Sequence, residues 1–329
     1  MTSSIQRFRF GLLLLLFSAV AAAEGLVMVT PLGSHDGEFC SRDRALIFED
    51  PSGTRLLYDA GRTVAGAADA RLGSIDVVLV SHMHGDHVGN RHIPGINAGS
   101  CKPPDTSVDA TPVSNSVKIA AAKQARMVTG SEMPRFFAAK LKQAGGKPGD
   151  SLLVRFGASR QIGGVTITTV PATHSNGIAP AFIGDKLGAM LEAAGVTAYA
   201  GPPTGYVLQF SNGLVVYLSG DTGVTAEQDM VVRQQYAAEL VVMNIGDTFT
   251  TGPKEAAYVV DDLVKAKSVI ASHANEEATR GGKVLPGTRT AEFMQLTQAP
   301  VHVPLSGRTM SFNADAQCVS GCSQAPMHR

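Results

Sequence analysis

The stretch Ser81-His82-Met83-His84-Gly85-Asp86-His87 places three histidines and one aspartate within six positions. It directly follows Ile75 to Val80, a run that is apolar except for Asp76 and is therefore typical of a strand buried on both faces. Imidazole nitrogens suit Zn²⁺ and similar metals, and a carboxylate adds a hard oxygen ligand. A single histidine after a strand is more often structural. Four ligand-type side chains on one turn at the rigid end of a strand instead favour a metal site.

This pattern, H-x-H-x-D-H after an apolar strand, resembles the signature of the metallo-β-lactamase superfamily. The other landmarks of that signature follow in order: His174 comes after a strand, Asp221 after the second strand of a hairpin, and His273 at a strand end. The resemblance implies two divalent metal ions, with Zn²⁺ expected first and Mn²⁺ or Fe²⁺ as alternatives. One ion would be held by His82, His84 and His174, the other by Asp86, His87 and His273, with Asp221 between them.

The resemblance also assigns roles around the metal ions. Asp86 and Asp221 are the candidate catalytic residues, and we expect Asp221 to relay a proton to the leaving group. Asp59, in Tyr58-Asp59-Ala60-Gly61, matches an acidic residue that supports a ligand histidine, although Asp-x-Gly is also a common turn. His35, just past the first strand, is a candidate for contacting the substrate or an ordinary surface-loop histidine.

Hairpin signals come first along the chain, and alternating strand and helix signals follow. Asp50-Pro51-Ser52-Gly53 and Asn212-Gly213 are turn sequences between apolar, β-rich runs. This order predicts an α/β fold in which helices cover sheets, and the resemblance implies a four-layer αβ/βα sandwich. We expect strands at 26–30, 44–49, 54–58, 75–80, 165–170, 206–210, 214–218, 240–245 and 268–271, and helices at 116–126, 132–143, 226–236, 253–265 and 288–296.

The N-terminus has the pattern of a secretory signal peptide, which would be residues 1–23. Arg7 and Arg9 precede the apolar run Phe10 to Val20, and Ala21-Ala22-Ala23 supplies small residues for cleavage. A membrane anchor is the alternative, but the run is shorter than the roughly 20 apolar residues that a spanning helix needs. We expect a periplasmic or secreted protein with no stable membrane span after cleavage. One domain would occupy 24–329, with an insertion at about 89–160.

Four cysteines follow the expected signal: Cys40, Cys101, Cys318 and Cys322. None is in C-x-x-C spacing or beside the histidine motif, so the sequence does not predict a zinc–thiolate site. An even number of cysteines in an oxidising compartment favours disulfides. We expect the pairs Cys40–Cys101 and Cys318–Cys322, against the alternative of four free, buried thiols.

Charge limits the class of partner. The chain has 28 Lys and Arg against 28 Asp and Glu, and no basic run stands out. A surface that follows nucleic-acid phosphates needs clustered positive charge. We therefore expect a small-molecule substrate and no nucleic acid; the sequence does not predict the oligomeric state.

Metal-dependent hydrolysis is the expected activity. Two metal ions lower the pKa of a shared water from about 16 towards 7, so that a metal-bound hydroxide could attack a small ester, lactone or phosphoester. The sequence contains no G-x-S-x-G motif that would supply a serine nucleophile. The segment Asn244 to Ala257 resembles the ascorbate-6-phosphate lactonase-like subgroup. The alternatives are an iron-dependent oxidoreductase of the same fold, a β-lactam hydrolase, which usually lacks an equivalent of Asp221, and a non-catalytic binding protein.

Overall fold

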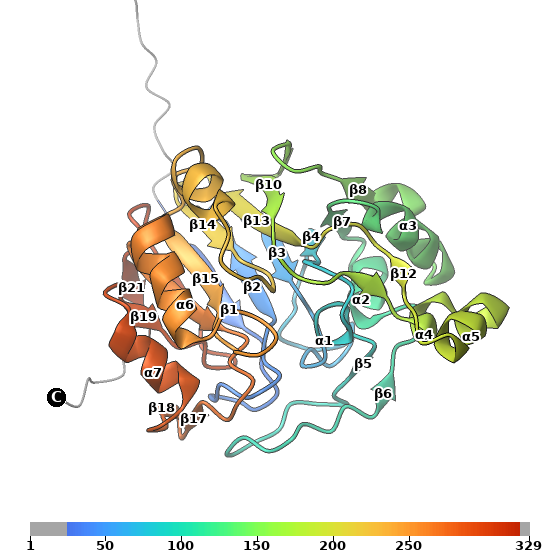
Figure 1. The fold of residues 1–329 in the computed structure, drawn as a ribbon, viewed down its shortest axis with the longest axis horizontal. Coiled ribbons are helices and arrows are strands. Elements are labelled where there is room, and N and C mark those ends of the chain that lie inside the picture. Colours follow the sequence, from blue (N-terminus) through green and yellow to red (C-terminus); the bar gives the residue numbers. More distant parts are fainter. Residues whose placement is uncertain (1–24, 323–329) are drawn as a thin grey trace, which may run out of the picture.

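The computed structural model describes residues 25–322, so the expected signal peptide lies outside the described residues. Two large sheets pack face to face, and helices cover their outer faces (Figure 1). Within residues 25–322, each helix is too short or too polar to cross a lipid bilayer. The expected four-layer sandwich is confirmed.

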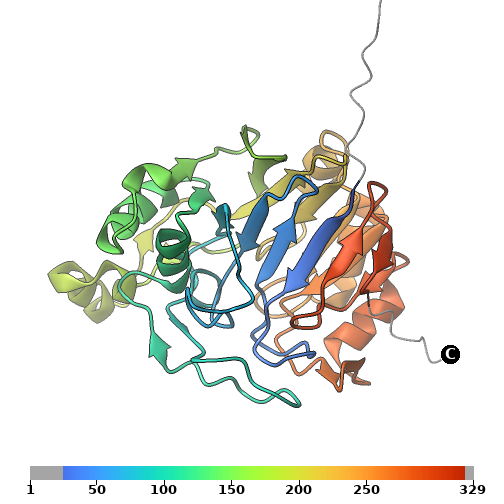
Figure 2. The same cartoon turned by 180° about the vertical axis from the view of Figure 1, so that it is seen from behind.

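The N-terminal sheet has eight strands and combines hairpins with parallel pairs. The turn at Asp50 to Thr54 joins two antiparallel strands, as expected, and the next strands in the sheet run parallel to the second strand of this hairpin. Figure 2 shows this sheet, with the blue N-terminal strands beside the red C-terminal ones. In spatial order its strands are β21 (Cys318–Ser320), β20 (Met310–Phe312), β1 (Val27–Pro31), β2 (Leu46–Glu49), β3 (Arg55–Tyr58), β4 (Val77–Leu79), β7 (Arg126–Thr129) and β8 (Ser151–Leu153).

The second sheet has seven strands. It contains a hairpin, and the strands that follow the hairpin along the chain are joined by parallel crossovers. The Asn212-Gly213 turn connects two antiparallel strands, and the strands after them pair in parallel. In spatial order its strands are β19 (Val301–His302), β16 (Ser268–Ser272), β15 (Leu240–Asn244), β14 (Val215–Leu218), β13 (Thr204–Gln209), β10 (Val165–Pro171) and β9 (Ser159–Ile162).

The core between the sheets consists of the alternate, inward-facing side chains of both sheets. Phe48 and Leu56 come from one sheet, and Ile167 and Leu208 come from the other. Tyr206 also lies here, and the single proton of its hydroxyl is shared between the carbonyl oxygens of Val80 (2.7 Å) and Val128 (3.0 Å). This contact joins the second sheet to the strand that precedes the histidine motif.

Helices form the two outer layers. One layer contains α2 (Asn115–Lys123) and α3 (Met133–Gln143), which pack on the first sheet, with η1 (Pro148–Asp150) after them. The other contains α6 (Pro253–Tyr258) and α7 (Arg289–Leu296) on the second sheet. The helices expected at 226–236 and 253–265 are partly π-helical, with wider turns at η2 (Gln228–Arg233) and η3 (Val259–Val264).

The segment 89–160, which we expected to be an insertion, contributes in part to the sandwich itself. Its strands β7 and β8 extend the first sheet. Between α1 (Gly85–Val88) and α2, the chain forms only the small ribbon of β5 (Arg91–His92) and β6 (Val108–Asp109). The sequence analysis did not predict β7. The strand is only four residues long and follows a turn-rich stretch, so it gives little periodic signal.

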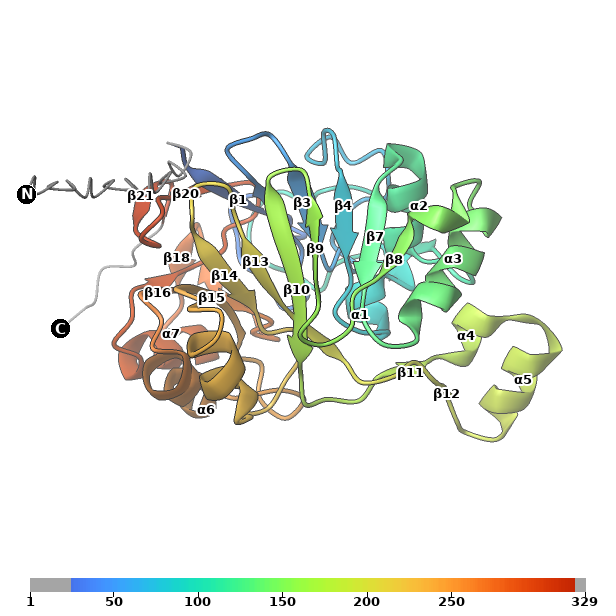
Figure 3. The same ribbon diagram turned by 90° about the horizontal axis from the view of Figure 1, so that it is seen from above.

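An arm extends from the body after His174 (Figure 3). It contains α4 (Pro180–Ile183) and α5 (Asp185–Ala193) between the paired strands β11 (Gly177–Ile178) and β12 (Ala198–Tyr199). Phe182 is buried, whereas Leu187 and Met190 are exposed. The last small ribbon, β17 (Thr279–Arg280) and β18 (Lys283–Val284), lies before α7.

Candidate metal centre

The histidine motif occupies the turn between β4 and α1. His84 precedes the first residue of α1, and Asp86 and His87 lie within this one-turn helix. Gly61, with φ of 53°, lies against it, because a Cβ at this position would be 2.4 Å from the carbonyl oxygen of Asp86. Close backbone packing therefore holds the turn in place, and His82 below it is fully buried.

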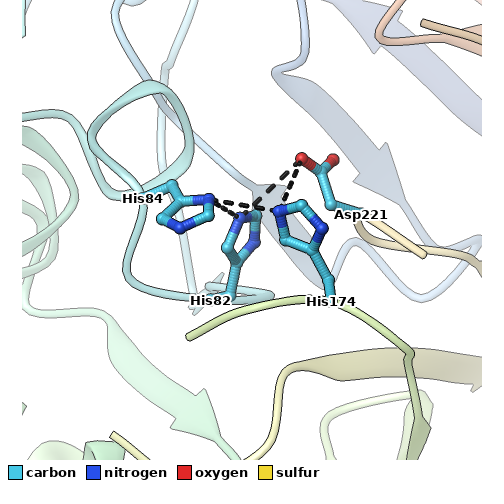
Figure 4. A group of neighbouring side chains, drawn as sticks. All are labelled: His82, His84, His174 and Asp221. Carbon is cyan, nitrogen blue, oxygen red and sulfur yellow. Dashed lines mark hydrogen bonds and ion pairs between the residues drawn. The ribbon is translucent and has the colours of Figure 1, made fainter. Parts of the chain in front are cut away.

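Four of the expected ligands converge in a first group: His82, His84, His174 and Asp221 (Figure 4). One ligand atom from each lies within 4.8 Å of the others. The Nδ1 atom of His84 is 2.9 Å from Nε2 of His82 and 3.2 Å from Nε2 of His174. Nitrogens bound to one tetrahedral zinc at about 2.0–2.1 Å are themselves roughly 3.3 Å apart. The three imidazoles are thus arranged as ligands of a common ion.

The second group contains Asp86, His87 and His273. Asp221 lies between the groups, because its Oδ2 is 3.8 Å from Nε2 of His82 and its Oδ1 is 3.2 Å from Nε2 of His87. His273 follows β16 directly, and its Nε2 is 3.2 Å from Oδ2 of Asp221. The structure therefore brings all seven expected ligands together, in the grouping that the resemblance implied.

These residues fit a bound metal, because several of their buried atoms lack other partners. Within the described part of the chain, Nε2 of His87, Oδ1 of Asp221 and both ring nitrogens of His273 have no hydrogen-bond partner. An unsatisfied buried polar group costs about 1–3 kcal/mol. Coordination of a divalent cation would satisfy these lone pairs together. His273 also has φ of 50°, a strained conformation that is common at functional sites.

The charges of the two groups stabilise one another. Burial raises the pKa of Asp221, but His87 and His273 outweigh it and hold that pKa well below its ordinary value. Burial also raises the pKa of Asp86, but Arg44 and His87 outweigh burial and hold this pKa well below its ordinary value. Burial and neighbouring imidazoles lower the pKa of His82 well below its ordinary value. Anionic carboxylates and neutral imidazoles are the forms that bind metals.

Asp59 supports the site from below. Its Oδ2 lies 2.8 Å from Nδ1 of His87 and accepts a hydrogen bond from the hydroxyl of Ser81 at 2.7 Å. Its Oδ1 accepts from the backbone N–H of Ser81 at 2.8 Å. The carboxylate therefore orients His87 so that its Nε2 faces Asp221, in keeping with the role expected of Asp59.

Sequence reasoning missed Arg44 as a member of the site. Arg44 is buried, and its Nε donates to Oδ2 of Asp86 at 2.9 Å while an Nη donates to Oδ1 of Asn275 at 2.8 Å. It thereby joins the histidine motif to the loop after His273. No local pattern marks Arg44, because its partners are far away in the sequence.

His35 is buried, which corrects the alternative that it is an ordinary surface-loop histidine, while its contact with substrate stays a prediction. Its ring is 3% exposed, and Nδ1 lies 3.0 Å from the hydroxyl of Ser34. The ring also lies beside Cys40, which is bonded to Cys101 as expected. The loop packs inwards because this disulfide and the pairing of His35 with Asn97 hold it against the segment after β5.

The comparisons with known proteins agree with this site. The family described as "Beta-lactamase superfamily domain" matches residues 54–274, which include all seven clustered ligands. The chain belongs to the metallo-β-lactamase superfamily. A UPF0173 metal-dependent hydrolase of Cupriavidus necator is 29% identical over 245 residues, which cover 73% of this chain and 71% of that protein. This chain is a metal-dependent hydrolase with a His/Asp metal-binding cluster.

Solved structures share the superfamily fold at lower identity. Igni18, a metallo hydrolase of Ignicoccus hospitalis, is 20% identical with a TM-score of 0.57, covering 88% of this chain and 99% of that one. CmlA, a diiron β-hydroxylase of Streptomyces venezuelae, is 12% identical with a TM-score of 0.53, covering 88% and 54%. Because proteins with different chemistry share the fold, the substrate must be argued from the site.

Proposed function

We propose that this superfamily member is an exported, binuclear hydrolase that cleaves a small ester, lactone or phosphoester. The observation that carries the proposal is the position of Asp221 between the two groups of ligands, with its Oδ2 3.8 Å from Nε2 of His82 and 3.2 Å from Nε2 of His273. Two divalent ions at such a site activate water and polarise the oxygen of the scissile bond. Zn²⁺ is the proposed metal because imidazoles dominate both groups.

Asp221 would act directly in catalysis, and Arg44 would act through Asp86. Asp221 is buried and ionised, so it can accept a proton from the attacking water and pass it to the leaving group. Arg44 holds Asp86 in one orientation and keeps it ionised. The side chains of Asp86 and His174 are 26% and 14% exposed, so substrate would approach from their side of the centre.

The positive charge of the arginines near Asp86 favours an anionic substrate. Arg62 lies over Gly85, and its Nε donates to Asn90 at 2.8 Å. Burial lowers the pKa of Arg62, and the nearby cations Arg42, Arg44 and Arg91 lower it further, while Asp86 opposes them. An anion would relieve this repulsion. Among the three substrate classes, this supports a phosphoester or a lactone bearing an acidic group, in keeping with the proposed ascorbate-6-phosphate lactonase-like subgroup.

A substrate screen tests the proposal. The protein, loaded separately with zinc and with manganese, would be assayed against phosphodiesters, acidic and neutral lactones, aryl esters and β-lactams. We expect hydrolysis of an anionic ester or lactone, and a loss of about 10²-fold or more in kcat for folded, metal-loaded Asp221→Ala. Near-parental turnover by this variant would refute the role of Asp221.

The same protein preparation distinguishes the proposed hydrolase from the alternative activities. Metal analysis after native purification should find zinc or manganese at about two ions per chain. Stoichiometric iron together with oxygen consumption would instead favour the oxidoreductase alternative, and turnover of β-lactams alone would favour the antibiotic-hydrolysing one.

The proposed export rests on the N-terminal sequence pattern and on the two disulfides, which persist in oxidising compartments. Cell fractionation followed by N-terminal sequencing tests it. We expect periplasmic or secreted protein that begins near Glu24. Uncleaved protein in the cytoplasm would refute export without touching the hydrolase proposal.

A further inference from the structure

A second cluster of metal-ligand side chains lies at one end of the sandwich, where the edge strands of the two sheets meet. His302 is on β19, the edge of the seven-stranded sheet, and Cys318 is on β21, the edge of the eight-stranded sheet. Figure 1 shows these strands side by side. A ring nitrogen of His302 and the sulfur atoms of Cys318 and Cys322 lie within 4.8 Å of one another.

The imidazole of His302 is buried without polar partners. The residue is 2% exposed, and neither ring nitrogen has a hydrogen-bond partner among residues 25–322. The ring contacts Phe312 edge-on, at 5.3 Å between centroids. By contrast, the buried His92 has its Nδ1 2.7 Å from the carbonyl oxygen of Ile93. Each unsatisfied buried group in a native protein needs an explanation, and a role as a metal ligand is one.

The backbone holds the two cysteines together in addition to the bond between them. Gly321 has φ of 73°, and a Cβ at this position would be 1.9 Å from the carbonyl oxygen of Thr309. This tight turn directs the chain back after β21, so that Cys322 meets Cys318. The sulfur atoms are therefore expected to stay close to each other, and to His302, when the disulfide is reduced.

We propose that reduction of the Cys318–Cys322 disulfide opens a second metal site, in which both sulfurs and one ring nitrogen of His302 bind one thiophilic cation, Zn²⁺ or Cu⁺. A dithiol would supply two electrons and two protons and would itself become a disulfide. The two new thiols lose their protons as the cation binds. Two thiolates and an imidazole match the preferences of these cations and leave one position open.

This site would act as a redox-controlled clamp. The ion would join the edges of the two sheets only when the cysteines are reduced, because a disulfide sulfur lacks the thiolate charge that binds the cation. The site shares no residue with the His/Asp centre, so it stands or falls independently of the proposed hydrolase function.

Cobalt(II) is the probe for the test. Sulfur ligation gives cobalt a thiolate-to-metal charge-transfer band in the near ultraviolet, and the His/Asp centre contains no sulfur that could produce it. We expect the band to appear in purified protein after treatment with a phosphine reductant and to be absent from oxidised protein. It should saturate at about one cobalt per chain beyond the cobalt that the His/Asp centre takes up. Titration with Zn²⁺ and with Cu⁺ shows which cation displaces cobalt at lower concentration.

Three variants decide the outcome. Cys318→Ser/Cys322→Ser should lose the band, whereas Cys40→Ser/Cys101→Ser should retain it. His302→Leu keeps an apolar core and should bind cobalt at least tenfold more weakly. If circular dichroism shows that His302→Leu is unfolded, His302→Gln is used in its place. The proposal is overturned if reduced protein shows no band, if the band persists without Cys318 and Cys322, or if the His302 variant binds cobalt as the parent does.

Discussion

Arg44 shows how a single buried side chain can couple distant parts of the metal centre. It contacts Asp86 from the histidine motif and Asn275 from the loop after His273. Hydrogen bonds between charged groups contribute about 1.5–3 kcal/mol. The geometry of Asp86 therefore depends on Arg44 as well as on the metal.

Replacing Arg44→Met should weaken binding of the ion that we propose at Asp86, His87 and His273 by about 10–100-fold, as loss of an outer partner of a metal ligand typically does. Metal content after dialysis against graded zinc concentrations measures the effect. Arg91→Met, which removes an exposed arginine, is the matched control and should keep both ions. Equal metal content in the two variants would contradict the assignment.

Protonation of His87 should compete with metal binding. Burial lowers the pKa of His87, but Asp221, Asp86 and Asp59 outweigh burial and raise it to about 10 in the metal-free protein. Because this pKa is raised, the proton is bound at every pH below it and must leave when the metal binds. The affinity of this ion should therefore fall about tenfold per unit as pH decreases from roughly 9 to 7.

Calorimetric titration in two buffers with different ionisation enthalpies counts the released protons. About one proton per ion at the second group is the expected result. An affinity that does not change over this pH range would show that His87 is already neutral before metal binds.

At the scale of elements, the short helix α1 depends on the close approach of Gly61. Both Gly61 and Gly53 have positive φ, 53° and 88°, but a Cβ at Gly53 would meet nothing within 4 Å. The left-handed conformation costs a residue with a Cβ about 1–2 kcal/mol. The contact with the carbonyl of Asp86 adds a steric cost at Gly61 alone.

Gly53→Ala should therefore lower the free energy of unfolding by about 1–2 kcal/mol and leave metal content unchanged. Gly61→Ala should lower it further and also reduce bound metal, because α1 must move away. Urea unfolding and metal analysis of both variants check this. Equal stability and equal metal content in the pair would mean that α1 tolerates the displacement.

At the scale of the whole molecule, the Cys40–Cys101 disulfide joins residues with a sequence separation of 61 and closes a loop that contains the histidine motif. Cross-linking distant residues restricts the unfolded chain, and the effect grows with the length of the closed loop. Cys318–Cys322, with a separation of four residues, should contribute less.

Cys40→Ser/Cys101→Ser should lower the free energy of unfolding by about 2–4 kcal/mol. Cys318→Ser/Cys322→Ser, compared under oxidising conditions, should cost roughly half as much on the same chain-entropy argument. Urea denaturation of both double variants provides the comparison. A larger loss from the C-terminal pair would show that native contacts, rather than loop closure, dominate.

Local patterns in the sequence determined much of the fold and the metal ligands. Turn residues such as Asn212-Gly213 and the apolar run before His82 reflect short-range backbone physics, so they identify the hairpins and the strand that carries the motif. The resemblance then located His174, Asp221 and His273 at strand ends. The edge strand β21 and its neighbour β20 escaped prediction because each is only three residues long and such short strands carry little periodic signal.

Only the tertiary structure decided which of the remaining polar side chains meet. Arg44 reaches Asp86, His35 turns inwards, and His302 comes to lie beside Cys318 on the other sheet and Cys322 just after it. These contacts depend on which strand ends and sheet edges become neighbours. That arrangement comes from packing between residues far apart in the chain. Local spacing and composition contain no information about such contacts.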